Sequence, residues 1–194
     1  MEREDRLCRY IDLPLQHVDD KILRLMGRGI TKRQIIDLLQ KIRDTVKEVF
    51  VRTTFIVGFP GETEREFDSL IQFIRDYPFE RLGCFIYSRE ENTRAYNFRD
   101  QVHYRTKRYR FNTLMSIQRE ISASLLTRLV GKRLKVLIER KESSSFVGRT
   151  EYDAPEIDGE VFIRKRNRTK IYIGDIMDTK IIGASDYDLE AEIV

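Results

Sequence analysis

The pattern of apolar and polar residues alternates between β-type and helical periods up to about residue 120. Three β-rich segments, residues 8–15, 50–57 and 81–87, are separated by segments in which apolar residues recur every three or four positions. The middle segment is almost continuously apolar, as expected of a parallel strand buried on both faces. The first segment should stop at Pro14, because proline cannot donate to a sheet ladder. This order indicates successive βα units and a parallel sheet, either open or part of a barrel.

Two of the helical segments begin with a capping box. Thr31 is followed by Gln34, and Thr63 by Glu66, so the side chains of each pair can satisfy free backbone donors at a helix start. A longer helix is predicted over residues 105–129. Five apolar residues of this helix are expected to point inward: Phe111, Leu114, Met115, Ile121 and Leu125.

After residue 131 the pattern changes to short β-rich pieces. These are residues 134–138, 145–150, 159–164, 170–173 and 180–182, with turn residues at intervals of roughly ten. Such spacing is typical of a small antiparallel barrel. The change of period predicts two domains, residues 1–121 and residues 122–194.

The composition restricts the class of protein. The chain is 41% hydrophobic and 35% charged, which excludes a disordered or collagen-like protein. No apolar run approaches the ~18 residues of a membrane-spanning helix, and no signal-peptide pattern opens the sequence, so we expect a cytoplasmic protein with no membrane partner. The net charge of +4 permits an anionic partner without requiring one. The two cysteines, Cys8 and Cys84, exclude a disulfide scaffold and a cysteine-built metal site within this chain.

The most informative stretch joins the second β-rich segment to the helix after it. Within residues 53–63, Gly58 and Gly61 precede the capping box, so backbone N–H groups lie at the carboxyl end of a predicted parallel strand. Parallel α/β folds bind ligands at this edge. The spacing is not that of a P-loop, and a tight turn without a ligand is the alternative interpretation. Polar residues near the strand ends are expected on the same face: Gln16, His17, Arg52, Tyr87 and Ser88.

Charge is segregated in the second predicted domain. Four acidic residues, Asp153, Glu156, Asp158 and Glu160, precede a basic run over residues 164–170. Such runs are usually solvated surface. Tyr172 is the aromatic residue near the basic run, whereas a nucleic-acid surface prefers several stacking rings among its cations. A solvated face and a nucleic-acid face both stay open.

Three motifs in order resemble consecutive strands of the radical S-adenosylmethionine (radical SAM) methylthiotransferases. They are YIDLPLQH at residues 10–17, TTFIVGFPGET at 53–63 and GCFIYS at 83–88. The back part resembles the TRAM domain of that family, an OB-like β-barrel. Within it, residues 148–159 (GRTEYDAPEIDG) are similar to a signature of the RimO-type branch. The resemblance implies an α/β partial (TIM-like) parallel barrel followed by a small all-β barrel.

The same resemblance implies a chemistry and its participants. The RimO-type branch transfers a methylthio group to the β-carbon of an aspartate in small-subunit ribosomal protein twelve, using S-adenosylmethionine and 4Fe–4S clusters. Six residues are thereby expected to bind S-adenosylmethionine: Gln16, Arg52, Val57, Gly58, Tyr87 and Ser88. Four are expected to bind the basic substrate protein: Asp153, Glu156, Asp158 and Glu160. No catalytic residue and no metal ligand is assigned.

One departure from the family changes the expectation for this chain. The CxxxCxxC motif that holds the family's catalytic cluster is absent from the 194 residues. The sequence therefore resembles the carboxyl-terminal portion of such an enzyme, and we expect this portion alone to be inactive. The alternatives are a fragment of the tRNA-modifying branch, a TRAM-mediated module that contacts RNA or the ribosome without catalysis, and an α/β protein with only an architectural likeness.

Overall fold

The computed structural model describes residues 4, 6–143, 145–164 and 170–194. The chain divides into two compact units. One, here called the α/β unit, comprises residues 11–118, and the other, the barrel unit, comprises residues 119–194 with the described residues up to 10. None of the described helices is long and apolar enough to cross a membrane.

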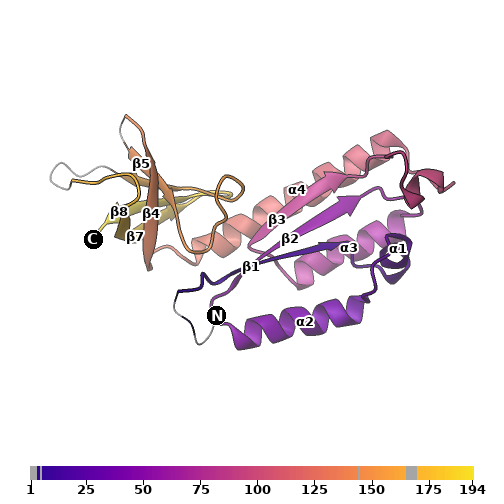
Figure 1. Cartoon of the computed structure of the whole chain (residues 1–194), viewed down its shortest axis with the longest axis horizontal. Coiled ribbons are helices and arrows are strands. Elements are labelled where there is room, and N and C mark those ends of the chain that lie inside the picture. The colour runs from indigo at the N-terminus through magenta and orange to yellow at the C-terminus, as the bar shows by residue number, and fades with distance from the viewer. Residues whose placement is uncertain (1–3, 5, 144, 165–169) are drawn as a thin grey trace. The chain divides into compact units, whose positions relative to one another are not determined.

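A three-stranded sheet forms the centre of the α/β unit. Its strands, in the order β1-β2-β3, are β1 (Tyr10–Gln16), β2 (Phe50–Val57) and β3 (Arg81–Ile86). β2 and β3 are parallel, with Thr54 opposite Gly83, and Figure 1 shows all three arrows pointing the same way. The predicted parallel α/β architecture is therefore confirmed.

The prediction that the first strand stops at Pro14 is wrong, since β1 continues to Gln16. β1 has one neighbour, β2, among the strands of the described sheet. A proline is tolerated in an edge strand, where its nitrogen can face away from the neighbouring strand and no ladder bond is lost.

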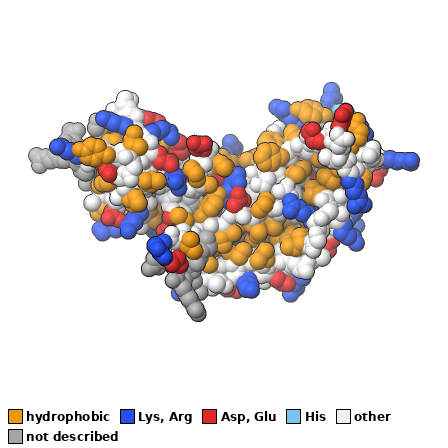
Figure 2. Space-filling view, in the orientation of Figure 1, with side chains coloured by type: hydrophobic (Ala, Val, Ile, Leu, Met, Phe, Trp, Pro, Cys, Tyr) orange, Lys and Arg blue, Asp and Glu red, His pale blue; other side chains and the backbone are white. Residues whose placement is uncertain are grey.

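The two faces of the sheet are unlike each other, and the prediction that β2 is buried on both is wrong. Its buried residues alternate with Arg52, Thr54 and Ile56, which are partly exposed. Phe85, opposite Ile56 on β3, is 62% exposed. Figure 2 shows hydrophobic side chains gathered on the face of this unit turned to the viewer.

Two of the helices, α2 and α3, begin at the predicted capping boxes. The helices are α1 (Asp20–Leu25), α2 (Lys32–Thr45), α3 (Glu64–Asp76), the 3₁₀ helix η1 (Arg94–Asn97) and α4 (Tyr104–Thr127). At α2, Gln34 Oε1 accepts from Thr31 N–H at 2.9 Å and Thr31 Oγ1 accepts from Gln34 N–H at 3.3 Å. At α3, the Glu66 carboxylate accepts from the backbone N–H of Thr63 at 2.8 Å and from its hydroxyl.

The inward face of α4 differs from the prediction. Of the five apolar residues expected inside, Leu114 is fully buried and the others are partly exposed. The buried stripe recurs every three or four residues and is mixed in character: Lys107, Arg110, Leu114, Gln118, Ser122 and Leu126. A hydrophobicity pattern misses this face because several of its members are polar, as with Gln118, whose Nε2 donates to the Phe79 carbonyl oxygen at 2.9 Å.

The barrel unit contains a closed barrel in the order β4-β5-β6-β8-β7. Its strands are β4 (Arg133–Lys141), β5 (Ser145–Arg149), β6 (Val161–Arg164), β7 (Ile176–Ala184) and β8 (Leu189–Ile193). β6 and β8 pair in parallel, and the other pairs are antiparallel. The predicted small all-β barrel is confirmed, with mostly aliphatic side chains at its centre.

The strand composition of the barrel differs from the prediction at two places. Residues 170–173 are not a strand. The strand that the sequence analysis missed is β8, in which Leu189, Ala191 and Ile193 are buried and alternate with Glu190 and Glu192. The acidic residues concealed a regular alternation with a period of two.

Candidate functional site

The carboxyl ends of the three strands meet at one edge of the sheet, and the buried carboxylate of Glu62 lies there. Glu62 follows the turn after β2, and its side chain has no exposed surface. Its Oε1 accepts from the backbone N–H of Gly58 at 3.0 Å and from Arg110 Nη1 at 2.7 Å. Arg110 also donates to the Glu62 carbonyl oxygen at 3.1 Å, so one guanidinium of α4 holds both the side chain and the backbone.

His17, the residue after β1, approaches the other oxygen of the same carboxylate. Its Nε2 lies 3.4 Å from Glu62 Oε2, and neither side chain is exposed. The His17 Nδ1 accepts from the backbone N–H of Asp19 at 3.0 Å, so the hydrogen of the neutral ring is carried by Nε2. The Nε2–Oε2 contact is not a hydrogen bond, and neither atom has another hydrogen-bond partner among the described residues. Glu62 thus contacts the residue after β1, the turn after β2 and a side chain of α4.

Lys107 of α4 contacts the end of β3. Its Nζ donates to the Tyr87 carbonyl oxygen at 3.0 Å and lies 4.7 Å from the centre of the Tyr87 ring. Burial lowers the pKa of Lys107, and the charge of Glu62 opposes this effect. The buried hydroxyl of Tyr87 has no hydrogen-bond partner among the described residues, and burial raises its pKa.

Gly58 is required where β2 turns toward α3. It has a φ of +73°, in the left-handed region that favours glycine. A Cβ at this position would lie 2.4 Å from Lys107 Cγ. The turn predicted from the two glycines thus exists, and the Lys107 side chain packs directly against it.

A pocket of about 300 Å³ opens at this edge of the sheet. Gln16 and Phe59 contribute to its lining, as does Ile56 from the exposed face of β2. The remaining lining comes from the end of α1 and from η1, at Leu25, Met26, Gly27, Arg28, Thr93, Arg94 and Ala95. Apolar walls with a few amide, hydroxyl and guanidinium groups suit a small organic ligand with polar or anionic ends.

The six residues predicted to bind the cofactor lie at different distances from this pocket. Gln16 lines it, with a left-handed φ of +71°. Val57 and Gly58 end β2 behind it, and the backbone N–H of Tyr87 donates to the Val57 carbonyl oxygen at 3.0 Å. Ser88 follows on the loop, where its hydroxyl donates to Glu90 at 2.6 Å.

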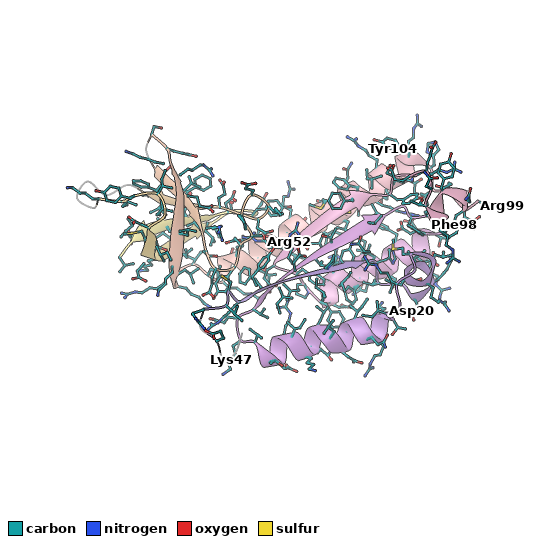
Figure 3. The ribbon with its side chains drawn as sticks, in the orientation of Figure 1. Asp20, Lys47, Arg52, Phe98, Arg99 and Tyr104 are labelled. Atoms are coloured by element: carbon teal, nitrogen blue, oxygen red, sulfur yellow. The ribbon has the colours of Figure 1, made fainter. Side chains whose placement is uncertain are left out.

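Arg52 is apart from the other five. It lies near the amino end of β2, where it pairs with Asp12 of β1 at 3.0 Å. It lies five positions before Val57, or roughly 16 Å along a strand. In Figure 3 Arg52 is labelled far from Asp20 and Phe98, which mark the other end of the sheet. The expectation that Arg52 converges with the strand-end residues is wrong, because position 52 faces the sheet surface well before the strand ends.

The acidic residues of the barrel unit are held mainly by contacts within that unit. Asp153 is 5% exposed and accepts from the Thr150 hydroxyl at 2.7 Å. Asp158 Oδ2 accepts from the Tyr10 hydroxyl at 2.7 Å. Glu160 binds Arg140 through both oxygens, one at 2.7 Å from Nη2, and this contact lowers the pKa of Glu160.

Three of these acidic residues share a second cavity. Glu156, Asp158 and Glu160 line a space of about 240 Å³, together with Glu139, Arg149 and Asp188. Glu156 has a φ of +63° and no hydrogen-bond or ion-pair partner among the described residues. The cavity is predominantly acidic, so it favours a cationic group.

Sequence analysis missed Glu62, Lys107 and Arg110. Glu62 stands in the quoted motif at residues 53–63, yet a glutamate just before a helix is usually solvent-exposed. The signal available in the sequence was its position four residues after Gly58, within reach of the backbone of the turn. Nothing in the sequence pairs Arg110 with Glu62, because 48 positions separate them.

The cysteines do not form a site. Cys84 is buried on β3, and burial, with a smaller effect of Glu62, raises its pKa to about 12, so the thiol stays protonated. Cys8 is exposed. Within the described part of the chain, no three side chains of His, Cys, Asp or Glu gather to hold a metal ion.

Comparison with known proteins gives matches across the chain. The radical SAM superfamily model matches residues 2–74, and the TRAM domain model matches residues 130–194. Similar proteins named ribosomal protein uS12 methylthiotransferase RimO come from Christiangramia forsetii, Cytophaga hutchinsonii and Petrotoga mobilis, with 47%, 45% and 41% identity. The alignments cover 99%, 100% and 100% of this chain but 42%, 44% and 44% of the relatives.

The chain thus spans less than half the length of the curated relatives that it matches. Among solved structures, a multidomain protein with nucleic acid binding domains from Streptococcus pneumoniae matches at 19% identity and a TM-score of 0.28. That match covers 34% of this chain and 23% of the other. It is too distant to bear on the fold.

Proposed function

Because the chain belongs to the radical SAM methylthiotransferase family, we propose that it is part of an enzyme that adds a methylthio group to the β-carbon of an aspartate in small-subunit ribosomal protein uS12. The observation that carries this proposal is the 40–47% identity to uS12 methylthiotransferases over essentially the whole chain. The acidic cavity of the barrel unit and the pocket at the strand ends supply the physical support.

The pocket at the strand ends fits S-adenosylmethionine. Its volume of about 300 Å³ suits part of a nucleoside ligand, and Ile56 and Phe59 offer apolar contact to a base. Gln16 contributes an amide, and Arg28 and Arg94 contribute guanidinium groups that suit a carboxylate. The hydroxyl of Tyr87 is a buried polar atom without a partner among the described residues. In this proposal Gln16 contacts the ligand, while Val57, Gly58, Tyr87 and Ser88 shape the edge behind it.

We propose further that the three-stranded sheet is part of a TIM-like radical SAM barrel, with Arg52, Thr54 and Ile56 on the interior face. The partial exposure of this face and the 62% exposure of Phe85 support the assignment. Arg52 then lines the barrel interior well below the pocket.

The residues present do not fit a 4Fe–4S cluster. Clusters of this type are held by cysteine thiolates. Of the two cysteines in this chain, Cys84 is buried with its pKa raised to about 12. These residues thus lack a thiolate set for the cluster, and we propose that the 194 residues do not catalyse methylthiolation by themselves.

The barrel unit is the proposed binding site for the substrate protein. Glu156, Asp158 and Glu160 line the acidic cavity, where carboxylates attract the side chains of a basic protein and repel phosphate. Asp153 supports the loop from within, because it is buried and bonded to Thr150.

A chimera tests the whole proposal. The segment of the Christiangramia forsetii enzyme that aligns with this chain is replaced by residues 1–194, and the purified, reconstituted chimera is incubated with uS12 protein. We expect mass spectrometry to show one methylthio group in place of one hydrogen on a single aspartate. A matched chimera with Glu156→Lys should lose substrate affinity while still cleaving S-adenosylmethionine. A correctly folded chimera that leaves uS12 unchanged would contradict the proposal.

The second candidate function is RNA binding by the barrel unit alone. Tyr172 and Ile173 are 65% and 68% exposed beside Lys170, and an exposed ring next to a cation suits a nucleic-acid base. Titration of the chain with RNA and with uS12 protein at several salt concentrations separates the two. RNA binding with a steep negative salt slope supports this candidate, whereas binding of uS12 protein without RNA binding supports the first.

A further inference from the structure

We propose that Glu62 is a positioning residue. It fixes Gln16 and Phe59, two residues that line the pocket at the strand ends, so the affinity of this pocket for its ligand depends on the buried carboxylate. The proposal rests on the proposed function only for the identity of the ligand, S-adenosylmethionine.

Gln16 and Phe59 are each adjacent in the sequence to a residue that Glu62 contacts. Gln16 precedes His17, whose Nε2 lies 3.4 Å from Glu62 Oε2. Phe59 follows Gly58, whose backbone N–H donates to Glu62 Oε1 at 3.0 Å. Gln16 and Gly58 both have left-handed φ values, +71° and +73°. A left-handed residue other than glycine persists only where its surroundings hold it in place.

The charge of Glu62 contributes as well as its shape. Arg110 is 3% exposed and donates to Glu62 Oε1 at 2.7 Å. Lys107 is 8% exposed, and Glu62 acts on its pKa through charge. With an uncharged residue at position 62, Arg110 would keep only Glu64, whose carboxylate lies 3.7 Å from Nη2 and is 67% exposed, so the buried cations would lose their buried counter-charge.

A glutamine cannot replace Glu62 in all its contacts. Oε1 accepts from Gly58 N–H and from Arg110, and Oε2 lies 3.4 Å from His17 Nε2 without a hydrogen bond. An amide has one oxygen, so its NH₂ group would oppose one of these donors. His17 cannot shift its hydrogen to Nδ1 without losing the bond from Asp19 N–H. Glu62→Gln therefore disturbs at least one of the contacts, with Gly58 or with His17, through which Glu62 positions Phe59 and Gln16.

Glu80 provides a matched control at the opposite end of β2. Its Oε2 accepts from the backbone N–H of Val51 at 2.9 Å, and Arg43 of α2 donates to Oε1 at 2.9 Å. Glu80 is 8% exposed, against 4% for Glu62. The two carboxylates thus make the same kinds of bond, but Glu80 lies away from the strand-end edge.

The experiment compares the 194-residue chain with its Glu62→Gln and Glu80→Gln variants, all labelled with ¹⁵N. We expect Glu62→Gln to move the amide resonances of Gln16 and Phe59 and to accelerate hydrogen exchange at Gly58, whereas Glu80→Gln leaves all three unchanged. Titration with S-adenosylmethionine should show an affinity about two- to thirtyfold lower in Glu62→Gln and unchanged in Glu80→Gln. Equal effects of the two substitutions on the amides of Gln16 and Phe59 would overturn the proposal.

Two further outcomes are decisive. If the unsubstituted chain does not bind S-adenosylmethionine but the amides of Gln16 and Phe59 still move in Glu62→Gln, the ligand assignment fails and the positioning role stands. If Glu62→Gln does not fold, Arg110→Lys replaces it, since this variant keeps the charge on a shorter side chain and withdraws it from Glu62, to which Arg110 Nη1 donates twice. The same two amides should then move, and unmoved amides in a folded Arg110→Lys variant would overturn the proposal.

Discussion

Replacing Gly58 by alanine is expected to destabilise the α/β unit by about 2–5 kcal/mol. Two effects contribute. An alanine in the left-handed region costs about 1–2 kcal/mol, and Gly58 has a φ of +73°. The added Cβ would lie 2.4 Å from Lys107 Cγ, and forcing an extra methyl into a packed region costs about 1–3 kcal/mol. Lys107 cannot move aside without losing its bond to the Tyr87 carbonyl oxygen.

Gly27 separates the two effects. Its φ of +74° is nearly the same, but no atom lies within 4 Å of a Cβ built there. Gly27→Ala should therefore cost only the backbone part, about 1–2 kcal/mol. Adding Lys107→Ala to Gly58→Ala should recover most of the difference, because the opposing methylenes are removed.

The variants are Gly58→Ala, Gly27→Ala, Lys107→Ala and the double variant Gly58→Ala/Lys107→Ala. Urea unfolding of these four and of the unsubstituted chain, followed by far-ultraviolet circular dichroism, measures the free energies. The helices α1 to α3 of the α/β unit contribute strongly to this signal. The double-mutant cycle between positions 58 and 107 then isolates their interaction. The reasoning is refuted if Gly58→Ala costs no more than Gly27→Ala, or if the cycle gives no coupling.

Three other predictions concern separate parts of the chain. Gly148→Ala should destabilise the barrel by about 3 kcal/mol or more in the same urea assay, because its Cβ would lie 2.0 Å from a backbone oxygen of β4. Gly183→Ala is the control and should change the stability little, because a Cβ there would lie 3.5 Å from the nearest atom, Glu190 Cβ. In the folded chain, a thiol reagent at mildly alkaline pH should modify exposed Cys8 and not Cys84, whose pKa is raised to about 12 by burial, and equal rates would contradict this. Burial alone would raise the pKa of Glu66, but hydrogen bonds from its N-cap threonine and from a lysine outweigh it and lower the pKa to about 2. The stability that Glu66 contributes should be full above about pH 4.5 and disappear as the pH falls toward 2. Glu66→Gln should therefore have a lower free energy of unfolding than the unsubstituted chain at pH 6 and about the same value near pH 2. A difference that persists at pH 2 would contradict this.

The sequence predicted those parts of the fold that depend on local patterns. Thr31 and Thr63 mark helix starts because a capping box involves only residues three positions apart. The extent of β2 follows from its apolar run, and the turn at Gly58 from the glycine itself. These signals need no knowledge of the tertiary structure.

The rest depends on contacts between residues distant in the sequence. Arg110 and Gln118 occupy buried positions of α4 because partners at Glu62 and Phe79 satisfy them, and these partners are 48 and 39 residues away. For the same reason the Glu62 cluster was not predicted. Arg52 was placed with the strand ends because it is polar, whereas its position along β2 determines that it pairs with Asp12.

The place of β8 in the barrel has a consequence for how copies of this chain could associate. β8 lies between β6 and β7, so it is the segment that closes the ring. A protease cut in the turn at residues 185–188 would separate β8 from the rest of the barrel, and loss of β8 would leave β6 and β7 each with an unpaired edge. The N–H and C=O groups on these edges can pair with the same edges of a second nicked molecule. Nicking at this turn should therefore open the barrel and favour association of nicked chains through the edges of β6 and β7.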